Sequence, residues 1–354
     1  MPGISSVPTI DLSQLDDPES KRQALATLEQ ACTDWGAFYI SGAPIGEDEL
    51  QNATRETKAF FEQPTEKKME IALENVPSFL GYVPLASERT GDKVDYRERI
   101  IVRPDDPRPS QDPIYRNLQG QTQWPAQMPG FRAAHEQVIK GFTKVASTVR
   151  ALLAEFLGID PAVLDGMFRE EACQNRNVII RYPEVPKDQG KQESLQGLHG
   201  HKDMTFGAII YQATDHESLQ IQSPTGQWVT CPPKPGSLLY VIGAIGESIT
   251  RGVCKAGFHR VLSTEPGSGP RYSFVTALHM DYDISLANPK IKKTLETIGQ
   301  DIYRKHGVSN QMLEDFLYEE FDTIGMRILA RYMRSLPHVT ARFYPEYSNR
   351  VSAA

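Results

Sequence analysis

One stretch of the chain has the apolar spacing of a long amphipathic helix. Between residues 131 and 157, apolar side chains recur every three or four positions, at Val138, Phe142, Val145, Val149, Leu152 and Phe156. This spacing places them on one side of an α-helix. We therefore predict a helix over 131–157 that packs its apolar stripe behind a sheet. Shorter patterns predict helices over 18–35 and 46–62, with a short strand at 37–40 between them.

Residues 176–281 have the pattern of repeated short strands. Runs rich in β-branched and aromatic residues alternate with turn signals, at Pro224-Thr225-Gly226, Pro235-Gly236 and Pro266-Gly267-Ser268-Gly269-Pro270. Short strands with such punctuation are typical of a double-sheet jelly roll. Before them, residues 79–103 look irregular, with a turn at Thr90-Gly91-Asp92, and as a loop they could reach over a pocket mouth.

Two helices are predicted after the strands, broken near Gly307. Their apolar positions are Ile291, Leu295, Ile298 and Ile302, then Met312, Phe316, Phe321, Ile324 and Leu329. The fold class we expect is mixed α/β, a double-stranded β-helix core with flanking N-terminal helices and a C-terminal helical region. We divide the chain into an N-terminal region (7–125) that packs on the core, a catalytic core with its backing helix (126–285), and a helical extension (286–354).

The composition is that of an ordinary globular enzyme. The chain has 354 residues, of which 40% are hydrophobic and 23% charged, with a net charge of −7. An acidic balance argues against nucleic acid or an anionic membrane as the main partner. No apolar run reaches the 18 residues of a membrane span, and the first residues do not resemble a secretory signal peptide. We expect a cytoplasmic protein with a small-molecule substrate; monomer and homo-oligomer are both compatible with this composition.

Four cysteines are scattered along the chain without a zinc-binding spacing. They are Cys32, Cys173, Cys231 and Cys254. In a cytosolic enzyme, reduced thiols are the expected state.

Two histidines and an aspartate form a candidate metal site. His201 and Asp203 are two residues apart, followed 56 residues later by His259. In a strand, residues i and i+2 point to the same face, so His201 and Asp203 could reach one ion while Lys202 points away. Two imidazoles and one carboxylate are the ligand set of non-haem Fe(II) oxygenases. His199 is an alternative ligand to His201, because it lies two residues before His201 and would share its strand face.

A candidate carboxylate receptor follows the last histidine. Arg271 and Ser273 lie shortly after His259 and share a strand face. A guanidinium binds a carboxylate through two parallel hydrogen bonds, and a hydroxyl could donate a third. At this point the chain resembles the isopenicillin N synthase-like family of Fe(II)- and 2-oxoglutarate-dependent dioxygenases, which has His-x-Asp, a distal His and Arg-x-Ser in this order.

The resemblance extends over most of the chain. Similar segments are Val7–Leu12, Ala31–Ile40, Phe60–Pro64 with Glu66–Lys68, and Ile180–Pro186, the last of which resembles cephalosporin-forming members. The resemblance implies Fe(II) bound by His201, Asp203 and His259, with 2-oxoglutarate and O2 as cosubstrates. It also implies that Arg271 and Ser273 hold the far carboxylate of 2-oxoglutarate, with Tyr182 adding a hydroxyl.

Four further residues are candidate contacts of the substrate. Arg181 precedes the metal strand and could face the pocket, and the alternative is an arginine on the sheet surface. Tyr82 and Arg89 lie in the stretch that could reach over the pocket, and Gln212 matches a glutamine that the family has after the metal carboxylate.

Three functions fit these residues. The first is a dioxygenase that oxidises a small molecule, by hydroxylation, desaturation or ring rearrangement, with release of succinate and CO2. A role in secondary metabolism follows by analogy from the resemblance. The second is an iron oxidase of the same family that uses no 2-oxoglutarate. The third is a binding protein that has kept the jelly roll without catalysis.

Overall fold

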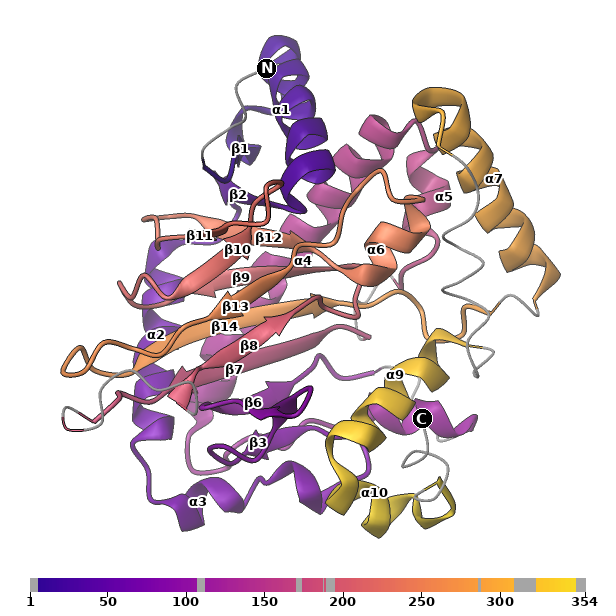
Figure 1. Cartoon of the computed structure of the whole chain (residues 1–354). Coiled ribbons are helices and arrows are strands. Elements are labelled where there is room, and N and C mark those ends of the chain that lie inside the picture. Colours follow the sequence, from indigo (N-terminus) through magenta and orange to yellow (C-terminus); the bar gives the residue numbers. More distant parts are fainter. Residues whose placement is uncertain are drawn as a thin grey trace.

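Two β-sheets face each other in the middle of the protein (Figure 1). The computed structural model describes residues 6–106, 112–169, 174–186, 188, 195–285, 288–308 and 323–347. The larger sheet has, in spatial order, β1 (Thr9–Asp11), β2 (Ala37–Ser41), β12 (Leu238–Ile242), β9 (Gly207–Gln212), β14 (Arg271–Leu278), β7 (Arg176–Tyr182), β6 (Glu98–Val102) and β3 (Gly81–Val83). The smaller has β11 (Trp228–Thr230), β10 (Leu219–Gln222), β13 (His259–Val261) and β8 (Leu198–His201).

This arrangement confirms the expected jelly roll. All pairs within the two sheets are antiparallel except β1 with β2. Strands from the N-terminal third, β1, β2, β3 and β6, complete the larger sheet on both sides. The stretch 79–103 is more regular than expected, because it forms β3 and β6 as well as a hairpin of β4 (Arg89–Thr90) and β5 (Lys93–Val94) around the predicted turn.

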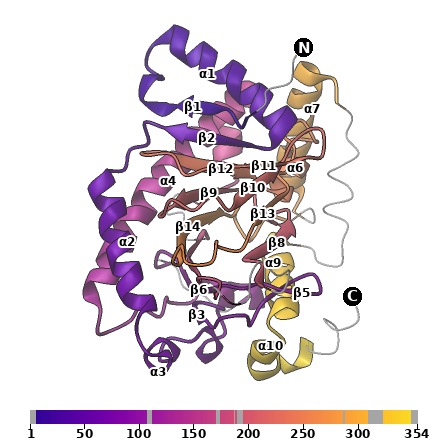
Figure 2. The ribbon, with the colours of Figure 1, turned by 60° about the vertical axis from the view of Figure 1, so that its left-hand side comes forward.

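The predicted long helix packs on the outer face of the larger sheet (Figures 1 and 2). It is α4 (Pro129–Leu157), and the stripe from Val138 to Phe156 is buried as expected. The ring of His135 meets Phe274 of β14 edge-on, with centroids 5.0 Å apart. Side chains at alternate positions of β14, such as Phe274, therefore pack against α4, while the residues between them face the smaller sheet.

The N-terminal helices lie close to their predicted positions. Helix α1 (Pro18–Gln30) begins at Asp17, whose carboxylate accepts a hydrogen bond from the Ser20 N–H, and continues into a π-helical turn over Ala31–Trp35. Helix α2 (Glu47–Phe61) begins after Gly46. The short helices are α3 (Thr65–Met69), α5 (Pro161–Asp165) and α6 (Ala244–Ile249).

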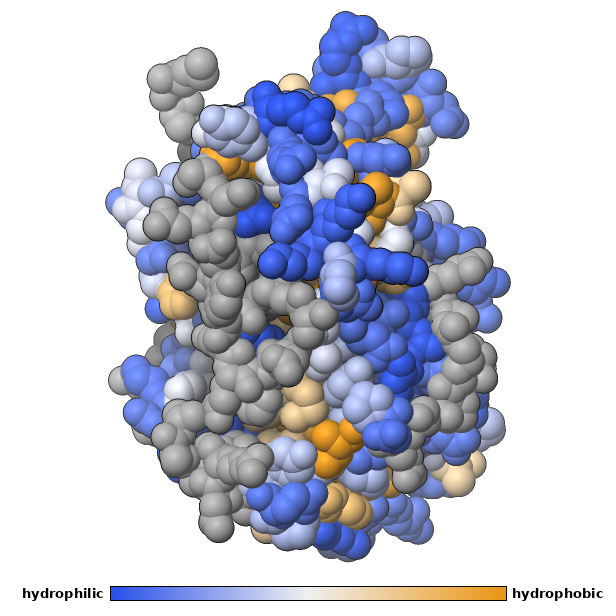
Figure 3. Space-filling model, turned by 90° about the vertical axis from the view of Figure 1, so that its right-hand side faces the viewer, coloured by the Kyte–Doolittle hydropathy of each residue, from blue (hydrophilic) through white to orange (hydrophobic). Residues whose placement is uncertain are grey.

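The C-terminal region is helical, and its first helix packs on α4, α5 and α6. It contains α7 (Pro289–His306), which ends at Gly307 in a left-handed conformation, then α9 (Ile324–Ser335) and α10 (Pro337–Phe343). The predicted apolar positions Met312, Phe316 and Phe321 lie outside the described residues. On the face with α7 and α9, most of the residues drawn in colour are hydrophilic (Figure 3).

Two expectations concern thiols and membranes. Cys32, Cys231 and Cys254 are free and buried, as predicted, whereas Cys173 lies outside the described residues. No helix in the described ranges is long and apolar enough to cross a membrane.

Candidate active site

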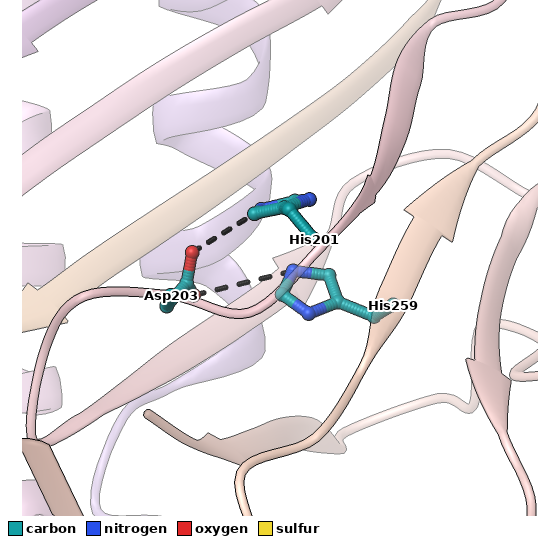
Figure 4. Close-up of side chains that lie close together, drawn as sticks. All are labelled: His201, Asp203 and His259. Carbon is teal, nitrogen blue, oxygen red and sulfur yellow. Dashed lines mark ion pairs between the residues drawn. The ribbon is translucent and has the colours of Figure 1, made fainter. Parts of the chain in front are cut away.

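Three side chains, from β8, from the loop that follows it and from β13, point toward one another (Figure 4). The Nε2 atom of His201 lies 3.3 Å from Oδ1 of Asp203, and Nε2 of His259 lies 4.0 Å from Oδ2 of the same carboxylate. One potential ligand atom from each residue lies within 4.8 Å of the others. In the described part of the chain, no other group of three His, Cys, Asp or Glu side chains has this geometry.

Backbone carbonyls orient both imidazoles. Nδ1 of His201 lies 2.8 Å from the carbonyl oxygen of His199, and Nδ1 of His259 lies 3.1 Å from that of Gly257. Each Nδ1 therefore carries the proton, so each Nε2 has a free lone pair on the side of Asp203. This is the usual support for metal-binding histidines. Two neutral imidazoles and one carboxylate fit Fe(II) and leave positions open for other ligands.

The charge states also suit a metal. Burial lowers the pKa of His259 to about 4, and the neighbouring His201 contributes to the shift. Burial alone would raise the pKa of Asp203, but the facing side chains of His201 and His259 and the charge of Arg331 hold it well below its usual range. A neutral imidazole and an ionised carboxylate are the forms that bind metal.

One detail of the predicted geometry is wrong. Strand β8 ends at His201, so Asp203 lies in the loop after the strand and not within it. The Asp203 backbone carbonyl accepts a hydrogen bond of 2.7 Å from the Ala244 N–H, which holds this loop against the start of α6. Lys202 does point away, as expected, and pairs with Glu247 at 2.9 Å.

The three side chains line a cavity of about 690 Å³ between the sheets. Its walls come from β7 and β14 on one side, from β8, β10 and β13 on the other, and from α9. Tyr182, Arg271 and Ser273 also line it, so the sequence-predicted metal and cosubstrate residues share one space.

Arg271 is a buried cation that faces this cavity. It is 1% exposed, and burial lowers its pKa. Its guanidinium carbon lies 4.9 Å from the ring centroid of Tyr182, its cross-strand partner. Nη2 donates to Oε1 of Gln212 at 3.1 Å, but Nε and Nη1 have no hydrogen-bond partner among the described residues. A buried guanidinium with donors to spare is a site for an anion, because such donors are costly to leave unpaired.

Two candidate substrate contacts lie on the wrong side of the sheet. Arg181 of β7 pairs with Glu98, and the Tyr82 hydroxyl and the Lys68 ammonium bind the same carboxylate. Neither Arg181 nor Tyr82 is among the residues that line the cavity. Successive residues of a strand point to opposite faces, so Tyr182 faces the cavity and Arg181 cannot.

The other two candidates lie nearer the cavity. Arg89 lines it from the β4–β5 hairpin, where it also donates to the Asp92 carbonyl at 3.2 Å. Gln212 is not a lining residue. Its amide nitrogen donates to the Cys231 carbonyl at 2.9 Å and its oxygen accepts from Arg271. Gln212 therefore lies beside Arg271, on the face of the sheet that it shares with its cross-strand partner Ser273.

His199 belongs to a different group from the three metal-ligand candidates. Its Nδ1 lies 3.1 Å from Oδ1 of Asp95, which also accepts the His199 backbone N–H at 3.2 Å. Asp95 is fully buried and receives a third hydrogen bond from Thr90. The metal cluster contains His201 and not His199.

Sequence reasoning missed several residues of the cavity wall. His279 continues the alternate positions of β14 that start at Arg271, so the strand period could have identified it. Burial lowers its pKa to about 3. Arg327, Arg331 and Arg334 of α9 also line the cavity, and no pattern within the sequence ties them to strands more than 100 residues earlier.

Comparisons with known proteins agree with this geometry. A family model described as "non-haem dioxygenase in morphine synthesis N-terminal" matches residues 7–127, and the model of the 2OG-Fe(II) oxygenase superfamily matches residues 171–279. The chain is 32% identical to "2-oxoglutarate-dependent dioxygenase frbJ" from Dothideomycetidae sp. (strain 11243), over 97% of this chain and 94% of that protein. It is 30% identical to a 2-oxoglutarate-dependent dioxygenase of Gibberella zeae, over 97% and 92%.

A solved structure shares the fold. It is the crystal structure of a 2OG-Fe(II) oxygenase family protein from Caulobacter crescentus, which superposes with a TM-score of 0.69 at 21% identity. The superposition covers 92% of this chain and 98% of that one.

Proposed function

Because the chain belongs to the 2OG-Fe(II) oxygenase superfamily, we propose that His201, Asp203 and His259 hold the iron of its active site. The protein is a 2-oxoglutarate-dependent non-haem iron dioxygenase, with Fe(II), 2-oxoglutarate and O2 as its cofactor and cosubstrates. Bound Fe(II) supplies the activation of O2 that is coupled to conversion of 2-oxoglutarate into succinate and CO2. The observation that carries the assignment is the convergence of three ligand atoms within 4.8 Å on one wall of the cavity.

Arg271, Ser273 and Tyr182 are the proposed contacts of 2-oxoglutarate. Arg271 supplies the positive charge and the two unpartnered donors, Nε and Nη1. Ser273 lies two residues along the same face of β14, so its hydroxyl points into the same part of the cavity. Tyr182 packs its ring against the guanidinium and limits the access of water to it. These contacts orient the cosubstrate with its 2-oxo acid end toward the metal ligands.

The proposed substrate is a small molecule of secondary metabolism. The protein itself is proposed to belong to the isopenicillin N synthase-like branch of the superfamily. A cavity of about 690 Å³ is of the size that binds drug-sized ligands. Hydroxylation, desaturation and ring rearrangement are all compatible with this site, because the outcome would depend on which C–H bond of the substrate the cavity walls present to the metal ligands.

An anaerobic titration tests the assignment. Adding 2-oxoglutarate to the Fe(II)-loaded protein should produce the weak visible charge-transfer band of a chelated 2-oxo acid. His259→Ala should lose iron and the band together. Arg271→Gln should keep iron but require about tenfold to hundredfold more 2-oxoglutarate, since a charge-assisted hydrogen bond contributes about 1.5–3 kcal/mol. Iron binding without any band in the wild type would favour the oxidase that uses no 2-oxoglutarate, and absence of iron binding would favour the non-catalytic binding protein.

A further inference from the structure

The cavity carries a large excess of positive charge. Eight arginine side chains line it, against two carboxylates, Glu88 and Asp203. The whole chain, in contrast, has a net charge of −7. Fe(II) and the dianion 2-oxoglutarate cancel each other's charge, so their binding leaves this excess in place. An enclosed space of one sign concentrates ligands of the opposite sign.

Part of this charge has a local explanation. Arg97 and Arg99 both pair with Glu88, and Arg97 also lies 3.4 Å from a carboxylate oxygen of Asp95. Arg176 is buried and donates to three backbone carbonyls, those of Ser78, Phe79 and Leu118. Arg271 faces the proposed place of 2-oxoglutarate. These arginines are therefore held by neighbours or assigned to the cosubstrate.

Two arginines of α9, Arg331 and Arg334, are different. Arg327, Arg331 and Arg334 are spaced four and three residues apart, which puts them on one face of the helix, and this face lines the cavity. Arg331 and Arg334 are exposed, and neither forms an ion pair or a hydrogen bond with a described residue. Like charges at this spacing repel each other on a helix, so the neighbouring guanidinium groups of Arg331 and Arg334 slightly destabilise α9.

Apolar side chains accompany the stripe. Ile324 and Ile328 of α9 line the cavity one turn apart, and Leu198 and Val261 line it from the smaller sheet. The space between α9 and the metal ligands thus has an apolar wall and a cationic end. A ligand that matches both has an apolar body and one anionic group.

Resting on the proposed function, we propose that the primary substrate is a small amphipathic carboxylic acid whose carboxylate is bound by Arg331, with Arg334 beside it. The guanidinium of Arg331 holds the carboxylate end, and the isoleucines of α9 and the apolar residues of β8 and β13 hold the body. Helix α9 is then the element that selects the substrate and sets which carbon reaches the metal ligands.

The test compares acids with their uncharged amides. Phenylacetate, cinnamate and decanoate, each paired with its primary amide, are titrated calorimetrically into the anaerobic Fe(II)-loaded protein with saturating 2-oxoglutarate, which keeps the acids out of the Arg271 site. At least one acid should bind tenfold or more tightly than its amide, a difference of about 1.4 kcal/mol. Arg331→Gln should reduce this preference about tenfold, and Arg331→Lys should restore part of it. Arg342→Gln, which changes an exposed arginine of α10 outside the cavity, should keep the preference in full.

Several results would overturn the inference. They are equal affinity for acid and amide in every pair, no acid binding below about 1 mM, or a preference that survives in a protein with both Arg331→Gln and Arg334→Gln. Thermal unfolding of each variant shows whether it is folded, and both positions are exposed, so the fold should tolerate the changes. Failure of the proposed function looks different: the wild type then binds no iron or no 2-oxoglutarate, which metal analysis and a titration with 2-oxoglutarate alone measure before any acid is added.

Discussion

His201 and His259 are direct cross-strand partners in the antiparallel pairing of β8 and β13, and their ring centroids lie 4.3 Å apart. Residues directly opposite each other in such a pair have neighbouring side chains. The sheet therefore brings together two imidazoles that are 58 positions apart in the chain. Asp203 reaches them from the loop that follows β8, so one pairing and one short loop build the whole cluster.

Removing any of these three side chains should abolish turnover without unfolding the protein. We expect His201→Ala, Asp203→Ala and His259→Ala to release no succinate above background, because two remaining ligands bind Fe(II) weakly. Circular dichroism should show an unchanged fold. Lys202→Ala is the matched control, since Lys202 lies between two of the ligands but pairs with Glu247. Full activity in any of the three alanine variants would exclude that residue as a ligand.

Gln212 should act on 2-oxoglutarate through Arg271. Its amide accepts a hydrogen bond from Arg271 at 3.1 Å and is anchored on the Cys231 carbonyl at 2.9 Å. We expect Gln212→Leu to raise the KM for 2-oxoglutarate about tenfold with little change in kcat, since the guanidinium loses its support but keeps its charge. Gln212→Glu should raise the KM further, because the new carboxylate competes for the guanidinium.

Steady-state kinetics with varied 2-oxoglutarate separates these effects. An unchanged KM in Gln212→Glu would mean that Arg271 does not bind the cosubstrate. A fall in kcat alone would point to a structural role for the glutamine.

Asp95 should support the iron site from a distance. It holds the backbone and the ring of His199, whose carbonyl oxygen in turn accepts Nδ1–H of His201. We expect Asp95→Asn to weaken Fe(II) binding about tenfold to hundredfold, the usual effect of losing an outer support of a metal ligand. Asp92→Asn, at an exposed position in the same hairpin, should bind iron like the wild type. Metal titration distinguishes the two, and equal affinities would refute the supporting role.

His135 should make the protein less stable in acid. Burial lowers the pKa of this histidine from 6.5 to about 3 in the folded state. Between these two pH values the unfolded chain binds a proton that the folded chain does not. The stabilisation is therefore complete above pH 6.5 and is lost as the pH falls, by up to about 1.4 kcal/mol per pH unit.

Denaturant unfolding at pH 7 and pH 5 measures this contribution. The difference in unfolding free energy between the two pH values should be smaller by about 2 kcal/mol in His135→Leu than in the wild type. Thr57→Val removes the hydrogen bond to His135 but leaves the ring buried, so it should keep the wild-type difference. An equal pH dependence in His135→Leu and the wild type would contradict the prediction.

Local sequence patterns were sufficient to predict much of the fold and the residues of the candidate site. The apolar period of α4, the alternation of turns and short strands, and the order of His-x-Asp, His and Arg-x-Ser each depend on residues close together in sequence. Such signals survive in one dimension because helix and strand periods are local properties of the chain. The division at 125/126 and 285/286 remains a prediction.

Other features depend on which face of a strand is turned inward. Arg181 and Tyr182 are neighbours in β7, and only the packing of α4 on one side and the smaller sheet on the other decides that Tyr182 faces the cavity. The same choice placed Tyr82 with Glu98 behind the sheet. A strand's period shows which residues share a face, but not which face will be covered.

The sequence by itself determined the family chemistry of the protein, the proposed ligands for iron, the proposed receptor for a carboxylate, and the kind of sheet that brings them together. Only the tertiary structure decided that α9 lies against the cavity and presents Arg327, Arg331 and Arg334 to it. The reason is physical. The contacts of α9 with the cavity walls from β7, β8 and β10, which lie more than 100 residues earlier, arise from three-dimensional packing. The amino-acid sequence has no periodic pattern that predicts them.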